Sequence, residues 1–522
     1  MTRPVVPLTL ADLDEQARND VFDELQSRMP RVWRAMRQNE QQESVVIVPS
    51  MSVDRVVAGS GAMNQALEER FLFMLLLLRQ PRLQMIYVTS MPINPSIIEY
   101  YLSLLPGVIP SHARARLLLV AVGDSSGTPL TEKLLARPRV LGQIRNLIPD
   151  TQLSHLVPYN TTPLERDLAV LLGIPMYAAD ARLFHLGTKS GSRQVFAEAG
   201  VSHPAGSEDL RSFDDLVSAL AQLRASRPQA TAAMVKLNEG VSGSGNAVID
   251  LVGLPVPGRP GESDALGRRV RKMVLEDLRI SVDVFLDKLT HREGIVEERI
   301  DGDELRSPSV QLQVTPLGEV ELLSTHDQVL GGRTGQSYLG CRFPADPAYA
   351  RLITDAAKKV GAVLAGRGVL GRFALDFVVV RTGGTWRAHA IEINLRKGGT
   401  THPFLTLQFL TDGHYEPDSA RFLTPRGEER HLVATDHLED PLLRGLRVDD
   451  LFDLVARAGL HFDQSRQTGV VFHMISCLTE VGRLGMTAIA ESPEAAQVLY
   501  EDAERRLLDD AALALRPQPL LG

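Results

Sequence analysis

Hydrophobic runs alternate with helix-like segments along the first third of the chain. Residues 44–49, 84–90 and 116–122 are predominantly apolar, as expected for strands that are buried on both faces of a parallel sheet. Between them, segments such as 97–105 carry apolar residues at helical spacing. Strands that alternate with helices predict a parallel sheet covered on both faces. Residues from about 43 to 180 are therefore expected to form a Rossmann-like α/β domain.

A different pattern governs the third quarter of the chain. Two runs of alternating apolar residues, 373–380 and 388–395, flank the sequence TGGT. Glycines between such runs indicate a β-hairpin. An antiparallel pair that folds about Gly384 places position 376 opposite position 392, because these two numbers sum to twice 384.

Three oxygen-bearing side chains fall together in this predicted hairpin. Asp376 interrupts the first run, and Glu392 and Asn394 share one face of the second run because side chains alternate along a strand. Two carboxylates and an amide oxygen suit a hard cation such as Mg²⁺, with Mn²⁺ as the alternative ion. The competing interpretation is that Asp376 and Glu392 are solvated positions on a half-exposed sheet. The depletion of Asp in strands favours the metal site.

Upstream, two lysines and a glycine-rich segment are candidates for holding phosphates. Lys189 opens a helix-like segment, and a helix N-terminus beside a lysine is a ready anion site. Lys236 lies inside an apolar strand, where an unpaired ammonium is costly and a phosphate partner would resolve that cost. The alternative for Lys189 is a surface lysine that caps a helix, and the alternative for the glycine-rich segment is a flexible turn. Backbone N–H groups of the glycine-rich segment can close over phosphates; its candidate residues are Gly240, Ser242, Gly243, Ser244 and Gly245.

Composition excludes several classes of protein. At 522 residues the chain is too long for one core, and its formal net charge of −8 gives no support to binding of nucleic acid or of an anionic membrane. Its two cysteines, Cys341 and Cys477, exclude a disulfide framework and favour the cytoplasm. The longest apolar run, 71–78, is far shorter than the roughly 20 residues of a membrane-spanning helix.

The hairpin also carries a family resemblance. The pattern D-F-V-V, turn, I-E-I-N-L-R at 376–396 resembles the metal-binding end of ATP-grasp enzymes. Its continuation K-G-G-T-T-H-P at 397–403 resembles the peptide ligases of the pheganomycin type, which contain a pre-ATP-grasp domain. The resemblance implies a multidomain α/β fold. Its expected parts are an N-terminal helix with the pre-ATP-grasp domain (1–180), an ATP-grasp catalytic domain (181–425) and a small C-terminal domain (426–522).

The resemblance further implies roles for individual residues. Lys189 and Lys236 match the lysines that reach the nucleotide phosphates in this family, and residues 240–245 match its glycine-rich lid. Arg396 matches the arginine of the metal-and-phosphate motif, so Arg396 and Lys236 are the expected catalytic residues. Two consecutive acids after an apolar pair resemble the hinge that meets adenine and ribose, although an ordinary hairpin with exposed acids is the alternative; the matching positions are Glu297, Glu298 and Ile300.

The expected activity is ATP-dependent ligation of a carboxylate to an amine or peptide acceptor through an acyl phosphate, in the assembly of peptide natural products. The alternatives are another ATP-grasp reaction, by a kinase or a carboxylase, and a non-catalytic ATP-binding regulator. The expected cofactors are ATP and Mg²⁺, and the expected assembly is a homodimer, the commonest oligomer.

Four further residues have polar side chains to which no definite role is assigned. Arg333 lies in a glycine-rich stretch, 325–340, that is expected to line a substrate cleft as a loop, and Arg372 precedes Asp376. His402 follows the metal motif closely and is a candidate substrate or supporting residue. His473 is interpreted as a packed histidine.

Overall fold

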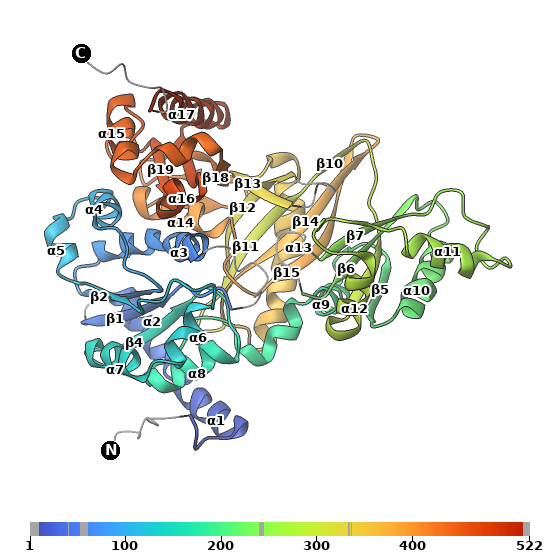
Figure 1. Ribbon diagram of the computed structural model, residues 1–522, viewed down its shortest axis with the longest axis horizontal. Coiled ribbons are helices and arrows are strands. Elements are labelled where there is room, and N and C mark those ends of the chain that lie inside the picture. Colours follow the sequence, from blue (N-terminus) through green and yellow to red (C-terminus); the bar gives the residue numbers. More distant parts are fainter. Residues whose placement is uncertain are drawn as a thin grey trace, which may run out of the picture.

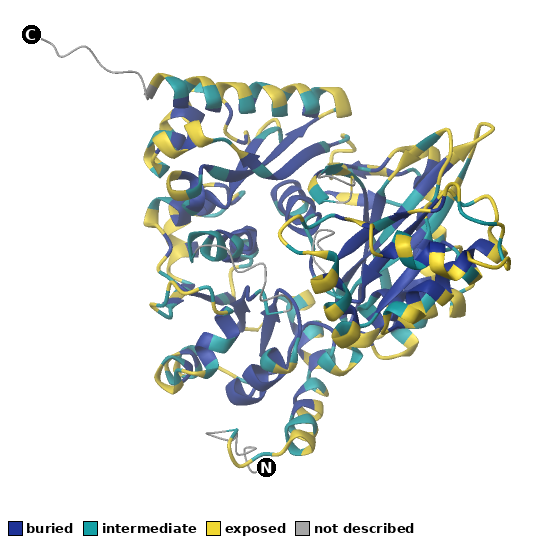
Figure 2. Ribbon diagram, turned by 45° about the vertical axis from the view of Figure 1, so that its right-hand side comes forward, coloured by how far each residue is buried: buried dark blue, intermediate teal, exposed yellow. Residues whose placement is uncertain are grey.

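The computed structural model describes residues 10–39, 41–52, 61–239, 245–331, 335 and 337–514. It contains an N-terminal α/β part, a long central sheet and a lobe that projects from the centre (Figure 1). The residues with the least exposure concentrate in the strands, and exposed residues concentrate on the outer helices (Figure 2).

The N-terminal part is built on a parallel sheet. Its strands lie in the order β3-β2-β1-β4, and all three pairings are parallel, which confirms the predicted α/β arrangement. Residues 175–177, which the sequence also indicates as a strand, make a single parallel bridge, between Met176 and Leu156. The strands are β1 (Glu43–Val48), β2 (Leu83–Thr89), β3 (Leu117–Ala121) and β4 (Ser154–Pro158). The helices are α1 (Glu15–Gln26), α2 (Met29–Gln38), α3 (Gly61–Glu69), η2 (Leu72–Arg79), α4 (Pro95–Ser103), α5 (Pro110–Arg114), α6 (Leu130–Leu135), α7 (Pro138–Leu147) and α8 (Pro163–Leu172).

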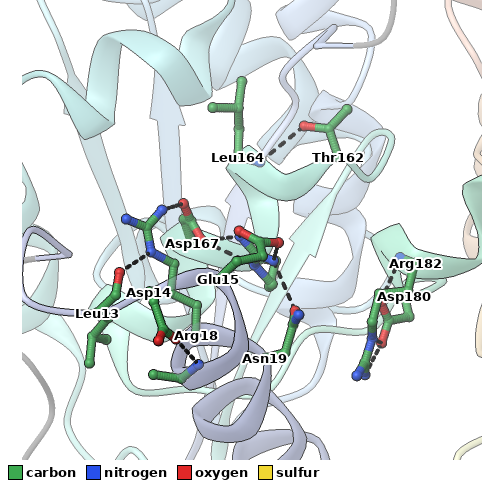
Figure 3. Close-up of polar contacts among 12 residues, drawn as sticks. Leu13, Asp14, Glu15, Arg18, Asn19, Thr162, Leu164, Asp167, Asp180 and Arg182 are labelled. Carbon is green, nitrogen blue, oxygen red and sulfur yellow. Dashed lines mark hydrogen bonds and ion pairs between the residues drawn. The ribbon is translucent and has the colours of Figure 1, made fainter.

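Ion pairs fasten the first helix to this part of the molecule. Arg18 of α1 donates to Asp167 of α8 at 2.9 Å, and the neighbouring Arg166 pairs with Glu15 and donates to Asn19 at 2.8 Å (Figure 3). Arg166 and Asp167 are buried, so the electrostatic attraction in these ion pairs is stronger than in water. Helix α1 is thereby an integral part of the N-terminal layer.

The projecting lobe carries an antiparallel sheet in the order β5-β9-β6-β7-β8. Helices of this lobe cover the sheet and are seen beside it in Figure 1. Its strands are β5 (Gly206–Leu210), β6 (Ala232–Leu237), β7 (Asn246–Asp250), β8 (Val274–Leu275) and β9 (Gly294–Glu298). The helices before and within it are η3 (Ala181–Gly187), α9 (Lys189–Glu198), α10 (Phe213–Ser226), α11 (Glu262–Val270) and α12 (Val282–Arg292).

A sheet of nine described strands forms the centre and continues into the C-terminal region. Its order is β10-β14-β11-β12-β13-β18-β20-β19, with β15 paired to β14. Its strands are β10 (Glu304–Arg306), β11 (Pro308–Val314), β12 (Val320–Gly331), β13 (Ser337–Phe343), β14 (Gly371–Thr382), β15 (Thr385–Asn394), β18 (His431–Glu439), β19 (Gly469–His473) and β20 (Arg483–Ala490). The other elements are α13 (Pro347–Gly366), α14 (Thr401–Thr411), β16 (His414–Glu416), β17 (Arg421–Leu423), η4 (Pro441–Gly445), α15 (Val448–Ala458), η5 (Ile475–Cys477), α16 (Leu478–Val481) and α17 (Pro493–Ala514).

The C-terminal strands therefore extend the central sheet through the pairing of β13 with β18. A shared hydrophobic core joins η2 and α4 of the N-terminal part to α14 and to strands β19 and β20. The domain boundaries at 180 and 425 stay predictions.

Two local predictions differ from the structure. Residues 325–340, expected as a loop, supply the end of β12 and the start of β13, because the alternating polar and apolar residues pair across a hairpin. Residues 254–268, where proline and glycine predict an exposed loop, contain the start of α11, which begins at Glu262 directly after Gly261. The apolar run 71–78, which predicts a buried helix, falls in the buried 3₁₀ helix η2. Among the described residues, no helix combines the length and the apolar character needed to cross a membrane.

Candidate functional site

The predicted hairpin forms, and its register brings the three candidate metal ligands together. Asp376 of β14 pairs with Glu392 of β15, and Ala374 pairs with Asn394. The Asn394 amide Nδ2 donates to Asp376 Oδ2 at 2.9 Å. The predicted opposition of positions 376 and 392 is confirmed.

The geometric reason for this register differs from the prediction. The turn contains Gly383 and Gly384, both with positive φ, as a two-residue hairpin turn requires. From this turn the pairs start at Thr382 with Thr385, whose numbers sum to 767. A bulge between Asp376 and Phe377 adds one residue on β15, so the ladder continues with Asp376 opposite Glu392.

Asp376 is held in a network that also raises its pKa. Burial, together with the neighbouring Glu392 carboxylate, raises the pKa of Asp376 to about 6. Gln328 Nε2 donates to Asp376 Oδ1 at 2.7 Å and partly opposes this rise in pKa. Gln328 belongs to the part of β12 that was predicted as a loop, so the sequence pattern gave no signal for this contact.

Lys189 reaches the same cluster from the N-terminus of α9. Its Nζ lies 2.6 Å from Glu392 Oε1, and the lysine is buried. The Thr188 side chain caps the helix by accepting from Gly191 N at 3.0 Å. Asn238, at the end of β6, accepts from Ser190 N at 2.9 Å and ties the lobe to this helix start.

Lys236 has a protein partner, which corrects the argument based on an unpaired charge. Its Nζ pairs with Glu297 Oε1, and both residues are buried. Glu297 also lies 3.4 Å from Arg193 Nη1, and Arg193 Nε is 2.5 Å from Glu208. Lys236 and Arg193 thus share Glu297, so a phosphate is not needed to balance the charge of Lys236. No sequence pattern indicates the role of Arg193, because the pairing joins distant segments.

The other two proposed hinge residues lie apart from this group. Glu298 is next to Glu297 on β9 and points to the opposite face, where its Oε1 accepts from Ala205 N at 3.0 Å and its Oε2 lies 3.3 Å from Arg227. Ile300 follows the end of β9 and is half-buried. The structure does not bring Glu298 and Ile300 to the lysines.

Most of the glycine-rich segment lies outside the described residues: Gly240, Ser242, Gly243 and Ser244. Gly245 is described, and its carbonyl accepts from Leu237 N at 2.9 Å. Arg333 also lies outside the described residues. Arg372 is placed beside Tyr177 and Glu321, and burial lowers the pKa of its guanidinium.

A pocket opens beside the hairpin, and its lining comes from the N-terminal part, the projecting lobe and the central sheet. The carboxyl end of β15 contributes Glu392, Asn394 and Arg396, and the segment after β4 contributes Asn160 and Thr161. The other lining residues are Phe184, Gly187, Asn238, Glu239 and Leu395. Arg396 is half-buried, and its Nη1 donates to the Lys397 carbonyl at 3.2 Å. Asn160, Thr161 and Asn238 belong to no motif of the sequence, and their proximity depends on the tertiary fold.

The side chains at this pocket fit a hard divalent cation bound with a polyphosphate. Asp376 and Glu392 supply anionic oxygens, and Asn394 retains an amide oxygen that is not used in its contact with Asp376. Lys189 and Arg396 supply positive charge at the same place. Because Lys189 already pairs with Glu392, the group holds both signs of charge within a few ångströms.

Comparison with known proteins gives the family. Residues 181–259 and 266–417 match a family model described as "IQCH-like, ATP-grasp", and residues 450–503 match one described as "PGM1 C-terminal domain". The chain is 31% identical over 452 residues to L-propargylglycine--L-glutamate ligase of Streptantibioticus cattleyicolor, a match that covers 84% of this chain and 89% of that protein. It is 24% identical over 475 residues to IQ motif-containing protein H of Danio rerio, covering 81% of this chain but 44% of that protein.

Solved structures share the fold at low sequence identity. The biotin carboxylase domain of 2-oxoglutarate carboxylase from Hydrogenobacter thermophilus, in complex with MgADP, superposes with a TM-score of 0.53 at 13% identity, covering 89% of this chain and 90% of that chain. An ADP complex of N5-carboxyaminoimidazole ribonucleotide synthetase gives a TM-score of 0.51 at 10% identity, covering 90% and 98%. The fold, the family models and the identity to the Streptantibioticus enzyme agree. This chain belongs to the ATP-grasp family, in the branch of carbon–nitrogen bond-forming ligases of the pheganomycin type.

Proposed function

We propose that this protein joins the carboxylate of one amino acid to the amine of another amino acid or peptide, using ATP and Mg²⁺. The observation that carries the proposal is the pairing of Asp376 with Glu392, with Lys189 Nζ at 2.6 Å from the glutamate and Asn394 beside the aspartate. This arrangement gathers the oxygen ligands and the positive charges that a metal–triphosphate complex requires.

The residues around the pocket have distinct roles in this proposal. Asp376, Glu392 and Asn394 would hold Mg²⁺, which supplies neutralisation of charge on the β- and γ-phosphates. Lys189 and Arg396 line or border the pocket and offset the remaining negative charge. Lys236, paired with Glu297, adds charge from the β6 side of the cleft. Nucleotide contacts by residues 240–245, Glu298 and Ile300 stay predictions.

The chemistry requires alignment rather than a covalent protein group. An oxygen of the substrate carboxylate forms a bond to the γ-phosphorus, the bond from that phosphorus to the β,γ-bridging oxygen breaks, and ADP leaves. The amine nitrogen then forms a bond to the acyl carbon, the carbon–oxygen bond to phosphate breaks, and the amine loses a proton. Fixed charges such as Lys189 and Arg396 favour the first step because negative charge passes to the leaving ADP.

Amino acids are the proposed substrates for both halves of the reaction. The name of the Streptantibioticus relative states that it joins L-propargylglycine to L-glutamate. An identity of 31% supports the same class of reaction here and leaves the two side chains to be found. A role in the assembly of small peptide natural products follows from this class of substrate.

The decisive experiment is product analysis by mass spectrometry. The purified full-length chain is incubated with ATP, MgCl₂ and pairs of amino acids that include L-glutamate, and ADP, phosphate and new amides are measured together. Hydroxylamine in a parallel reaction converts an acyl phosphate into a hydroxamate. The expected result is one amide and one phosphate for each ADP.

Glu392→Gln is the matched control for this experiment, because it keeps the size of the side chain and removes one charge from the pocket. Amide formation is expected to disappear in this variant. A phosphorylated or carboxylated product, in place of an amide, would overturn the proposed reaction in favour of a kinase or a carboxylase.

A further inference from the structure

A second group of ligand-type side chains lies in the C-terminal half of the chain, and the function proposed above does not use it. His402 comes from α14, Asp436 from β18 and His473 from the end of β19, and all three are buried. Both histidine Nε2 atoms and Asp436 Oδ1 lie within hydrogen-bonding distance of one another: His402 to His473 at 3.0 Å, His473 to Asp436 at 2.8 Å and His402 to Asp436 at 3.1 Å.

Hydrogen bonds alone do not satisfy this triangle of atoms. Each neutral imidazole Nε2 carries either a proton or a lone pair. If both Nε2 atoms donate to Asp436, two N–H groups face each other across the third side. If one Nε2 is unprotonated, its lone pair faces the carboxylate oxygen. One of the three sides is therefore repulsive in either tautomer, whereas a cation near the centre makes all three attractive.

The distances are also close to those of a coordination shell. Zinc binds imidazole nitrogen and carboxylate oxygen at about 2.0–2.2 Å, so two ligand atoms in a tetrahedral site lie about 3.3 Å apart. The three sides here, 2.8, 3.0 and 3.1 Å, are shorter by a few tenths of an ångström. A small outward movement of the side chains would accommodate the ion.

Arg70 holds one of the three ligands in place. Its Nη1 lies 2.7 Å from Asp436 Oδ2, fixes the carboxylate from behind and favours its ionised form. An ionised carboxylate is the form that binds a metal.

The backbone leaves room for this arrangement. A Cβ built on Gly485 of β20 would lie 2.0 Å from His473 Nε2, so the imidazole occupies the space of the missing side chain. The cluster joins three segments of the C-terminal half, and Arg70 adds a fourth from the N-terminal part. An ion here would connect the helix that follows the Arg396 motif to the strands β18 and β19.

We propose that His402, Asp436 and His473 bind a transition-metal dication, with zinc as the best match to two imidazoles and one carboxylate, at a structural site separate from the magnesium–nucleotide pocket. Imidazole donors select zinc over magnesium, which prefers oxygen. Three protein ligands leave one position of a tetrahedral site to a small non-protein ligand.

The test is the metal content of the full-length chain without a histidine tag. The protein is incubated with ZnCl₂, desalted and analysed by mass spectrometry of the elements, and CoCl₂ is used in a parallel titration because tetrahedral cobalt absorbs visible light. We expect about one zinc per chain, a cobalt absorption band of tetrahedral type, and a rise in the melting temperature with zinc.

Four variants test where the ion binds. Asp436→Asn and His473→Gln are expected to lose the bound zinc and the cobalt band. His326→Gln is the matched control, since His326 is also a buried histidine but bonds to Ser324 and Gln311, and it should retain the ion. Glu392→Gln should also retain zinc, which separates this site from the nucleotide pocket.

Two results would overturn the proposal. One is a wild-type chain that, after incubation with zinc, holds less than about a tenth of an ion per molecule and shows no cobalt band. The other is an Asp436→Asn or His473→Gln chain that is folded by circular dichroism and binds as much zinc as the wild type. Both results are independent of ligase activity, so they leave the proposed function untouched.

Discussion

Two clusters of ligand-type residues lie on different strands of the central sheet and on helix α14, and they differ in their donor atoms and in their exposure. Asp376, Glu392 and Asn394 supply oxygen atoms and are half-buried, and Glu392 and Asn394 line an open pocket. His402, Asp436 and His473 supply mainly nitrogen atoms and are buried. The first arrangement suits an ion that must exchange with its nucleotide at every turnover. The second suits an ion that stays in place.

The largest expected effect separates the two clusters by activity. Glu392→Gln should reduce ATP turnover by about a hundredfold or more, because loss of a supporting residue alone can cost 10- to 100-fold and Glu392 is a proposed ligand. The measurement is the rate of ADP release at saturating Mg²⁺. A turnover rate within a factor of two of the wild type would refute the assignment of Glu392.

The second effect separates the two clusters by their contribution to stability. Asp436→Asn removes the partner of Arg70 in a buried pair, and breaking such a pair costs about 3–5 kcal/mol. The free energy of unfolding, measured in urea, should fall accordingly. Asp510→Asn is the control, since Asp510 pairs with the exposed Arg457 at 3.3 Å and its loss should have little effect. Equal stability of the two variants would contradict the importance of the buried pair.

The third effect is a pH dependence of metal binding at Asp376, Glu392 and Asn394. Because burial and Glu392 raise the pKa of Asp376 to about 6, protons compete with the divalent ion below that pH. Affinity for Mn²⁺ in the presence of ADP should fall by up to about tenfold per pH unit below 6 and level off above 7. Isothermal titration calorimetry measures the affinity for Mn²⁺ at each pH, and Asp376→Asn should abolish the decrease below pH 6.

In the metal-free protein, stability depends on pH in the opposite direction to metal affinity: it falls as the pH rises. The folded pKa of Asp376 lies above the value of about 3.9 for an unfolded chain, so the folded state binds more protons between these two pH values. The Asp376 contribution to the free energy of unfolding is therefore largest at low pH and is lost as the pH rises through about 6. Added metal should remove this loss.

The smallest expected effect concerns the support of Lys189. Thr188→Ala removes the cap of α9 and should cost about 1 kcal/mol of stability, while the KM for ATP rises because Lys189 is less firmly placed. Ser212→Ala removes the equivalent cap of α10, away from the pocket, at a similar cost. An increase in KM of the same size in both variants would show that Thr188 has no specific role.

The elements of the fold were largely accessible from the sequence because they depend on local periodicity. The alternation of apolar runs and helices gave the parallel sheet of the N-terminal part, and the two-residue period gave the hairpin with Asp376. The opposition of Asp376 and Glu392 was predicted correctly, but from symmetry about Gly384. In the structure, a tighter turn and a bulge combine to give the same pair.

The partners within the site were less accessible, since they depend on contacts between distant segments. Lys236 appeared to lack a counter-ion, yet Glu297 lies diagonally across from it on β9. Glu297 and Glu298 looked equivalent in the sequence, and the alternation of the strand places them on opposite faces. Gln328 was missed because a polar, glycine-rich stretch resembles a loop even where it pairs as a hairpin.

The bulge in the hairpin has a consequence for protein engineering. Ile391 is the extra residue of β15 and has no register partner on β14. Deleting it leaves the order of all paired residues intact but straightens the strand at the point where the carboxylates meet. A deletion variant would therefore keep every ligand and change only the bend, which isolates curvature of the backbone as a variable in tuning metal selectivity.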